Sequence, residues 1–172
     1  MTISLKTPVS KQDLEKLKVG DRVLLSGKIY TARDQAHLRL VSDSKLYFEL
    51  KNATLYYVGP TPARPGNIIG SSGPTSSYRM DNLAVPLMEK GVSVMIGKGD
   101  RSKEFRLSLV ENKAVYMIAT GGAGALLASR VKSSKVIMYE DLGPEAVHEL
   151  IVEDFPCIVA YDIHGNDIFS TT

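Results

Sequence analysis

The chain has 172 residues, of which 44% are hydrophobic and 23% are charged, as expected for one globular domain spanning residues 1–172. Its formal net charge is only +2, so we do not expect a nucleic-acid partner. Cys157 is the single cysteine, which excludes an internal disulfide and the usual zinc or iron–sulfur ligand sets from this chain alone. Residues 1–20 contain no apolar stretch of signal or transmembrane length, which favours a cytoplasmic protein without a membrane partner.

Local patterns in the first half predict alternating strands and helices. Ser10 followed by Asp13 is a helix-capping pattern, and Thr31 followed by Asp34 predicts the cap of a second helix. The segment 61–77, rich in Gly, Pro, Ser and Thr, is too long for a turn and is a candidate functional loop. The predicted elements are a helix before residue 20, a strand over 21–30, a helix over 31–42 and a strand over 53–58.

The second half alternates more regularly, which is typical of an α/β fold with parallel strands. Pro86 interrupts one predicted helix, and Pro144 begins the last one. Helices are predicted over 79–90, 103–112, 124–131 and 144–152, and strands over 92–96, 114–120, 135–139 and 158–161.

The segment 70–81 has the composition of an anion-binding loop that leads directly into a helix. Its glycines, including Gly73, let backbone amides converge, and hydroxyl groups such as that of Thr75 add donors. Arg79 can bind a carboxylate or a phosphate through two hydrogen bonds. A capped loop without a ligand has the same composition and is the alternative interpretation.

Two more cations stand beside the predicted ends of elements. Arg33 opens a predicted helix, and Lys98 lies between Gly97 and Gly99 after a predicted strand. Such side chains are usually solvated, but the two cations together with the loop arginine would hold a substrate with two carboxylates if they converged. His37 lies one turn after Arg33 on the same face, and either acid–base chemistry or a structural role would suit it.

Several motifs occur in a fixed order. They are Thr-Ala-Arg-Asp-Gln-Ala-His over 31–37, Gly-Pro-Thr-Ser-Ser-Tyr-Arg-Met-Asp over 73–81, Gly-Lys-Gly over 97–99 and Gly-Gly-Ala-Gly-Ala over 121–125. Further similarity at 140–146, 152–156 and 162–167 extends the match over nearly the whole chain. In order and spacing, these motifs resemble the beta subunit, or carboxy-terminal domain, of class I iron–sulfur fumarases and L-tartrate dehydratases.

The resemblance implies an α/β fold, specifically a three-layer swivelling β/β/α domain with a partly parallel central sheet. It implies a partner as well, a larger alpha subunit that holds a four-iron four-sulfur cluster on three cysteines, in an assembly of two alpha and two beta chains. This chain would bind no metal itself and would be inactive without the alpha subunit. The implied reaction is the reversible hydration of fumarate to malate.

By the same resemblance, Thr75 would remove the carbon-bound proton, with His37 as the competing acid–base candidate. The carboxylates of the substrate would be bound by the four residues Arg33, Gly73, Arg79 and Lys98, with Thr75 beside them. Tyr78 stands where many members have Gly or Met, so L-tartrate or mesaconate are alternative substrates. A non-catalytic module that binds a small anion is the alternative to an enzyme subunit.

Overall fold

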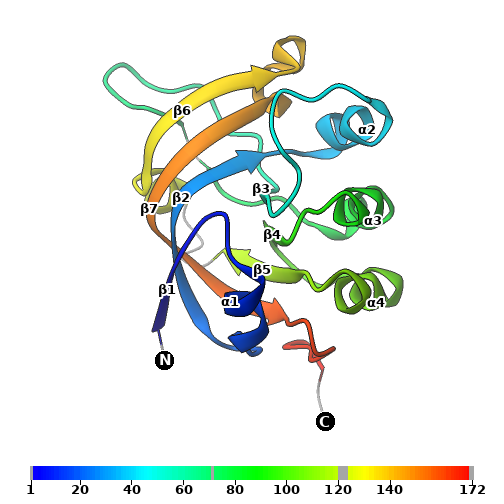
Figure 1. Ribbon diagram of the computed structural model, residues 1–172. Coiled ribbons are helices and arrows are strands. Elements are labelled where there is room, and N and C mark those ends of the chain that lie inside the picture. Colours follow the sequence, from blue (N-terminus) through cyan, green and yellow to red (C-terminus); the bar gives the residue numbers. More distant parts are fainter. Residues whose placement is uncertain (1, 71, 120–123, 171–172) are drawn as a thin grey trace.

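The computed structural model describes residues 2–70, 72–119 and 124–170, which form a mixed α/β fold with a sheet of seven strands (Figure 1). The strands are β1 (Thr2–Lys6), β2 (Arg22–Thr31), β3 (Thr54–Tyr56), β4 (Val94–Gly97), β5 (Val115–Ala119), β6 (Val131–Met138) and β7 (Val147–Tyr161). The α-helices are α1 (Lys11–Lys16), α2 (Asp34–Ser42), α3 (Asp81–Glu89), α4 (Lys103–Asn112) and α5 (Gly124–Ala128), and the 3₁₀ helices are η1 (Tyr78–Met80) and η2 (Glu140–Glu145).

The sheet is parallel on one side and antiparallel on the other. Its strand order is β1-β2-β3-β4-β5-β7-β6, and the first five strands in that order run parallel. The long strand β7 runs antiparallel to β2, β5 and β6. Because β7 pairs with both β5 and β2, the five strands β2, β3, β4, β5 and β7 close into a ring.

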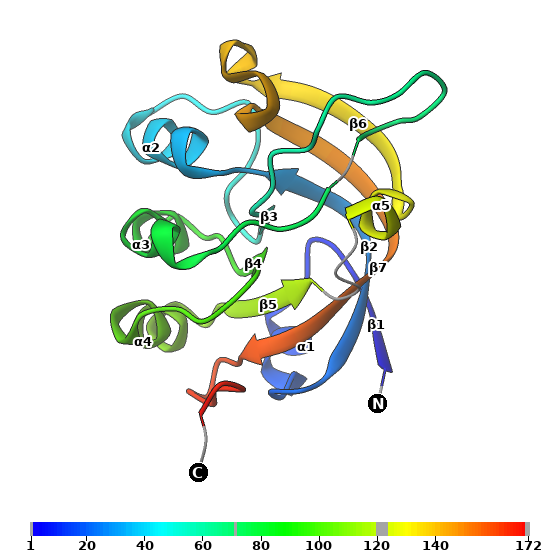
Figure 2. The same cartoon turned by 180° about the vertical axis from the view of Figure 1, so that it is seen from behind.

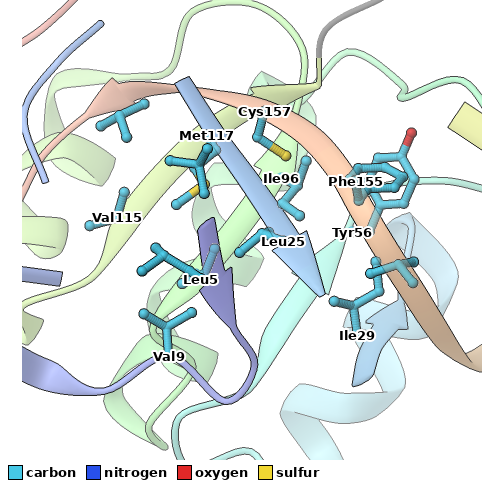
Figure 3. Packing of buried hydrophobic residues seen from close by; sticks show 14 of the residues in the cluster. Leu5, Val9, Leu25, Ile29, Tyr56, Ile96, Val115, Met117, Phe155 and Cys157 are labelled. Carbon is cyan, nitrogen blue, oxygen red and sulfur yellow. The ribbon is translucent and has the colours of Figure 1, made fainter. Parts of the chain in front are cut away.

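Two hydrophobic clusters lie on opposite faces of β3, β4 and β5. Along β3, Tyr56 belongs to the cluster enclosed by the strands (Figure 3), whereas Leu55 and Tyr57 belong to the cluster under the helices. This alternation follows the two-residue period of a strand. Helices α2, α3 and α4 stack on one side of these strands, and β2, β6 and β7 curve around the other (Figures 1 and 2). The predicted α/β fold with a partly parallel sheet is therefore confirmed, whereas the swivelling architecture stays a prediction.

Three of the predicted helices correspond to α1, α3 and α4 of the structure. The Ser10 side chain accepts a hydrogen bond from the Asp13 amide at the start of α1, as predicted. Helix α4 occupies the predicted residues, and the Ser102 side chain caps it by accepting a bond from the Phe105 amide. Helix α3 passes through Pro86 without ending there.

Two local predictions are wrong. Thr31 does not cap α2, because it is the last residue of β2 and its hydroxyl donates to the Ala146 carbonyl at 3.3 Å. The N-cap of α2 is Arg33, which makes no capping bond through its side chain. The strand β1 was not predicted at all; it adds a parallel edge to β2.

The largest error concerns the segment 144–152, which was predicted as a helix. In the structure, η2 ends within this segment at Glu145, and β7, a strand of 15 residues that includes the predicted strand 158–161, begins at Val147. Its first part pairs with β6 on one side and with β2 on the other, so the backbone donors and acceptors are satisfied by neighbouring strands. Strand β6 likewise begins at Val131, earlier than predicted.

Candidate functional site

The predicted site residues follow the carboxyl ends of neighbouring parallel strands. Arg33 comes two residues after β2, and Lys98 comes directly after β4. The loop that carries Gly73 and Thr75 follows β3, which lies between those two strands. In parallel sheets this edge is where ligands bind, so the fold places these residues where a site is expected. The predicted motif over 121–125 follows β5, but its first three residues lie outside the described residues.

The Arg33 side chain packs against Gly59, in the segment that follows β3. A Cβ at Gly59 would come within 3.0 Å of Arg33 Cδ and 3.3 Å of Nη1, so the missing side chain of Gly59 makes room for the guanidinium. The nearest carboxylate is Glu145, with 4.0 Å between Arg33 Nε and Glu145 Oε1. At that distance the pair is electrostatic rather than a hydrogen bond. The guanidinium thus keeps its capacity to bind another anion.

The Arg79 guanidinium also has a single carboxylate near it among the described residues. Its Nη2 atom lies 3.7 Å from Asp34 Oδ1, so the first turn of α2 and the helix η1 are neighbours. The side chain of Arg79 is 42% exposed, and Tyr78 beside it is 64% exposed. Both arginines therefore have a loose carboxylate neighbour and an exposed surface.

Thr75 is fixed to the end of β3 by its backbone and its side chain. Its amide donates to the Tyr57 carbonyl at 3.0 Å, and its Oγ1 donates to the same carbonyl at 3.2 Å. Gly73, two residues earlier, packs near α5, where a Cβ at Gly73 would lie 3.7 Å from Gly124 Cα. Thr75 is partly buried, and its Oγ1 is oriented toward the end of β3 by the bond to Tyr57.

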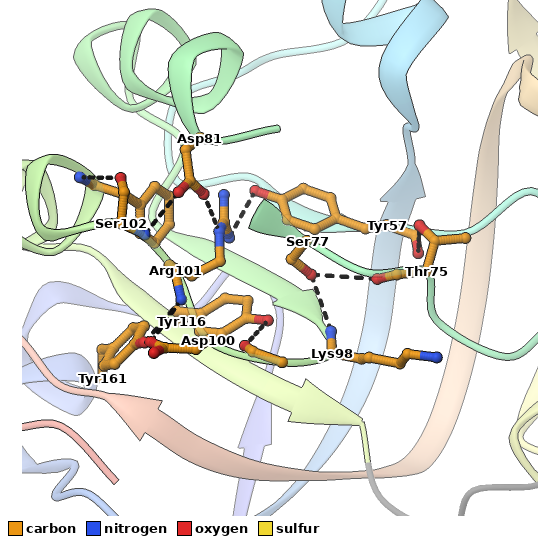
Figure 4. Close-up of polar contacts among 12 residues, drawn as sticks. Tyr57, Thr75, Ser77, Asp81, Lys98, Asp100, Arg101, Ser102, Tyr116 and Tyr161 are labelled. Carbon is orange, nitrogen blue, oxygen red and sulfur yellow. Dashed lines mark hydrogen bonds and ion pairs between the residues drawn. The ribbon is translucent and has the colours of Figure 1, made fainter. Parts of the chain in front are cut away.

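Ser77 connects Thr75 to Lys98. The buried Ser77 hydroxyl accepts from the Lys98 amide at 2.9 Å and donates to the Thr75 carbonyl at 3.3 Å, and the Ser77 amide donates to the Lys98 carbonyl at 3.1 Å (Figure 4). A Cβ at Gly97 would overlap Ser77 Oγ, so this close approach requires glycine. The Lys98 side chain is exposed and, in Figure 4, extends to the side on which Thr75 lies.

A buried ion pair supports this part of the site. Arg101 has a fully buried side chain, and its Nε donates to Asp81 Oδ1, while the Ser102 amide donates to Asp81 Oδ2 at 2.7 Å. The guanidinium carbon lies 3.5 Å from the centre of the Phe105 ring and 5.1 Å from that of Tyr57. Its Nη1 lies 3.5 Å from the Tyr57 hydroxyl (Figure 4).

Local sequence patterns did not indicate a supporting role for Ser77, Tyr57, Asp81 or Arg101. Two signals could have pointed to the ion pair. Asp81 ends the motif over 73–81, and Arg101 comes two residues after the Gly-Lys-Gly motif. Their mutual contact depends on the three-dimensional arrangement of α3 and the end of β4, which local patterns do not encode.

His37 lies inside the molecule rather than on the open edge. Its Nδ1 is 2.8 Å from the Arg33 carbonyl, and its ring meets the Tyr57 ring edge-on with 5.2 Å between centres. Burial lowers the pKa of His37 to about 4, and the positive charge of Arg101 acts in the same direction. The imidazole is therefore neutral near pH 7.

Cys157 is not placed to ligate a metal cluster. It is buried in β7, and burial raises the pKa of its thiol, which disfavours the thiolate that ligation requires. Among residues 2–70, 72–119 and 124–170, no three His, Cys, Asp or Glu side chains are grouped as a metal site. The residues of this chain do not fit a four-iron four-sulfur cluster.

A cavity of about 620 Å³ lies beside the candidate site rather than in it. The loop between β3 and η1 forms one wall through residues 61–70, and α5 together with the start of β6 forms the other. None of the predicted site residues belongs to its lining within the described part of the chain. No helix among the described residues is long and apolar enough to span a membrane.

Comparisons with known proteins identify relatives along the whole chain. A protein of Methanocaldococcus jannaschii, provisionally named L(+)-tartrate dehydratase subunit beta, is 43% identical over 94% of this chain and 88% of its own length. Fumarate hydratase 2 of Leishmania major is 35% identical over 99% of this chain, and the aerobic class I fumarate hydratase of Escherichia coli K12 is 34% identical over 97%. This chain spans only 31% and 32% of those two hydratases.

The names of these relatives are those of hydro-lyases, enzymes that add or remove water. The family model described as "Fumarase C-terminus" matches residues 1–172, which is the full length of the chain. The resemblance noted from the motifs is therefore confirmed, and the chain belongs to the Fumarase C-terminus family.

Proposed function

We propose that this chain is the beta subunit of a two-subunit iron–sulfur hydro-lyase that reversibly hydrates fumarate to malate. The main support is the placement of Arg33, Thr75, Arg79 and Lys98 along the carboxyl edge of adjacent parallel strands. The three cations are partly or fully exposed, and the nearest carboxylates to the two arginines lie 3.7 and 4.0 Å away. A substrate with two carboxylates supplies the complementary charge.

In this proposal the chain binds the substrate and handles one proton. Arg33 and Arg79 bind carboxylate, with the backbone at Gly73 close by. In the dehydration direction, Thr75 Oγ1 in its deprotonated form takes the carbon-bound proton and becomes a hydroxyl. The electron pair of the broken C–H bond moves into the adjacent carboxylate and then forms the C=C bond as hydroxide leaves the neighbouring carbon. Lys98 stabilises that developing charge. A threonine hydroxyl is a weak base, so Thr75 requires a cation such as Lys98 nearby.

We assign the cluster to a partner alpha chain, because the thiol of Cys157 is buried and the described residues lack a cluster-binding group. Two alpha and two beta chains would make the assembly, and the beta chain alone would be inactive. The relative named as a beta subunit supports a separate partner. Residues 1–172 would act as one domain, with the cytoplasm as the proposed location.

L-Tartrate is the second candidate substrate. The relative named after tartrate dehydratase is matched over 88% of its length, whereas the fumarate hydratases are matched over about a third. Mesaconate would need the same three cations. Substrate choice among these acids depends on the shape of a pocket that this chain would share with the partner.

Reconstitution tests this proposal directly. The chain is co-expressed without oxygen together with a cysteine-bearing candidate partner, and each chain and the mixture are assayed with fumarate, L-tartrate and mesaconate. We expect hydration of fumarate in the mixture alone, lost after exposure to air. Higher activity with L-tartrate than with fumarate would identify L-tartrate as the substrate instead. An assembled, cluster-loaded complex that converts none of the three would favour the non-catalytic anion-binding module.

A further inference from the structure

We propose that His37 is a positioning residue, whose neutral ring joins Arg33 to the strand end that holds Thr75. This inference deepens the proposed function and depends on it, because Arg33 and Thr75 are active-site residues only in that proposal. It assigns to His37 a role different from that of an acid or base. The ring itself would not touch the substrate.

The hydrogen bonds fix which ring nitrogen carries the proton. The Arg33 carbonyl accepts from the His37 backbone amide at 2.9 Å and lies 2.8 Å from Nδ1. A carbonyl oxygen cannot donate, so Nδ1 must carry the proton in this contact. In the neutral ring, Nε2 is then an acceptor, and among the described residues it has no hydrogen-bond partner.

The surroundings of the ring disfavour a second proton and exclude solvent. His37 is fully buried in the chain. The charged groups that act on it are Arg101, which opposes protonation, and Asp34 on the same helix, which favours it. A group that exchanges protons with a substrate must reach it directly or through one water, and the ring is enclosed by protein on the side of Tyr57.

The same ring also contacts the residue that holds Thr75. The His37 and Tyr57 rings meet at an interplanar angle of 68° with 5.2 Å between centres, an edge-to-face arrangement. The Tyr57 carbonyl accepts both bonds from Thr75, at 3.0 and 3.2 Å. His37 is thus in contact with Arg33 through its Nδ1 and with the support of Thr75 through its ring edge.

Two amide substitutions separate positioning from proton transfer. His37→Asn places an amide nitrogen near Nδ1 and can still donate to the Arg33 carbonyl, whereas His37→Gln places it near Nε2. In the assembled complex with fumarate, we expect kcat to fall by less than about tenfold for Asn and by about a hundredfold for Gln, since small displacements of reacting groups cost this much. Both variants should keep the pH profile of the unmodified complex.

Equal losses in the two variants would overturn the proposal, because they would mean that the Nδ1 bond to the Arg33 carbonyl does not decide the effect. The disappearance of one limb of the pH profile would also overturn it, because it would mean that His37 itself moves a proton. A ¹⁵N NMR measurement on the full chain provides a test that is independent of activity. At pH 7 we expect the neutral ring with its proton on Nδ1, and the loss of this signal in His37→Asn identifies it. A charged ring, or a proton on Nε2, would contradict the proposal.

Thr75→Ala, measured in parallel, separates a failure of the proposed function from a failure of the role assigned to His37. Normal turnover of Thr75→Ala would overturn the proposed mechanism, while the NMR result would still report on His37. If Thr75→Ala loses turnover while His37→Asn and His37→Gln lose equal amounts of kcat, only the role of His37 would be overturned.

Discussion

The two sides of the candidate site are held in different ways. On one side, which we call the arginine flank, Arg33 and Arg79 face partly exposed carboxylates at 4.0 and 3.7 Å. On the other, the threonine flank, Thr75, Ser77 and Lys98 are connected by hydrogen bonds of 2.9–3.3 Å. Exposed ion pairs restrict side chains weakly, whereas buried hydrogen bonds fix them. Under the proposed function, this difference predicts that substrate binding tolerates movement of the arginines, whereas proton transfer does not tolerate movement of Thr75.

The largest expected effect concerns the ion pair that supports the threonine flank. Asp81→Asn removes the charge that compensates the buried guanidinium of Arg101. Breaking a buried pair in this way should lower the free energy of unfolding by about 3–5 kcal/mol, measured by urea denaturation of the full chain. The double variant Asp81→Leu/Arg101→Met leaves no unpaired charge and should recover much of the loss. A change below about 1 kcal/mol in the single variant would contradict this view of the flank.

A pH series tests His37, which contacts Arg33 of the arginine flank and Tyr57, the residue that holds Thr75. Its pKa is about 4 in the folded chain and 6.5 in its ordinary state, so between these values the unfolded chain binds a proton that the folded chain does not. Stability should therefore fall as the pH falls from about 6.5 to about 4, by up to about 3 kcal/mol from this residue.

The control for that series is His37→Asn, which cannot titrate. All other titrating groups are shared by the two proteins, so the difference between their stability curves isolates His37. Parallel curves from pH 7 to pH 4 would mean that the pKa of His37 is the same in the folded and the unfolded chain, which would contradict the prediction.

A smaller effect is expected at the arginine flank. Arg79→Lys keeps the charge but loses the two-bond geometry for a carboxylate, so KM should rise about tenfold while kcat changes less. Steady-state kinetics of the reconstituted complex provide the measurement. Arg39→Lys is the matched control, because Arg39 makes two bonds to Asp141 away from the site. Equal kinetics for both variants would place Arg79 outside the site.

The smallest effect should follow a change at the surface. Asp141→Asn weakens the bonds from Arg39, but both side chains are well exposed. Exposed pairs contribute little, so the melting temperature should stay within experimental error of the unmodified chain. A loss comparable to that of Asp81→Asn would remove the distinction between exposed and buried pairs on which the comparison of the flanks depends.

The central strands and helices were predictable because their signals are local. Strand β2 is rich in β-branched and aromatic residues, β3 to β5 are short, mostly apolar runs, and α4 begins after the capping residue Ser102. The segment 144–152 was misread because Pro144 is a residue that commonly begins a helix. Its pairing with β6 and, above all, with β2 from the distant start of the chain makes it a strand.

The sequence indicated the residues of the candidate site that follow strand ends, but not the residues that support them. Arg33, Thr75, Arg79 and Lys98 belong to motifs that also follow strand ends, and both features are visible in the sequence. The bond from Ser77 to the chain at Lys98, and the buried pair of Arg101 and Asp81, join residues about twenty positions apart. Such contacts depend on how the loops pack, and no local pattern contains that information.

The central claim is that this chain supplies the proton-transfer group of a hydro-lyase. Thr75→Ala in the assembled, cluster-loaded complex tests it most directly, with the binding of the dicarboxylate and the turnover measured on the same sample and Thr75→Ser as the control that keeps a hydroxyl. We predict that binding and assembly persist while turnover falls by at least about a hundredfold, as for the loss of a general base. Turnover close to that of the unmodified complex would contradict the claim.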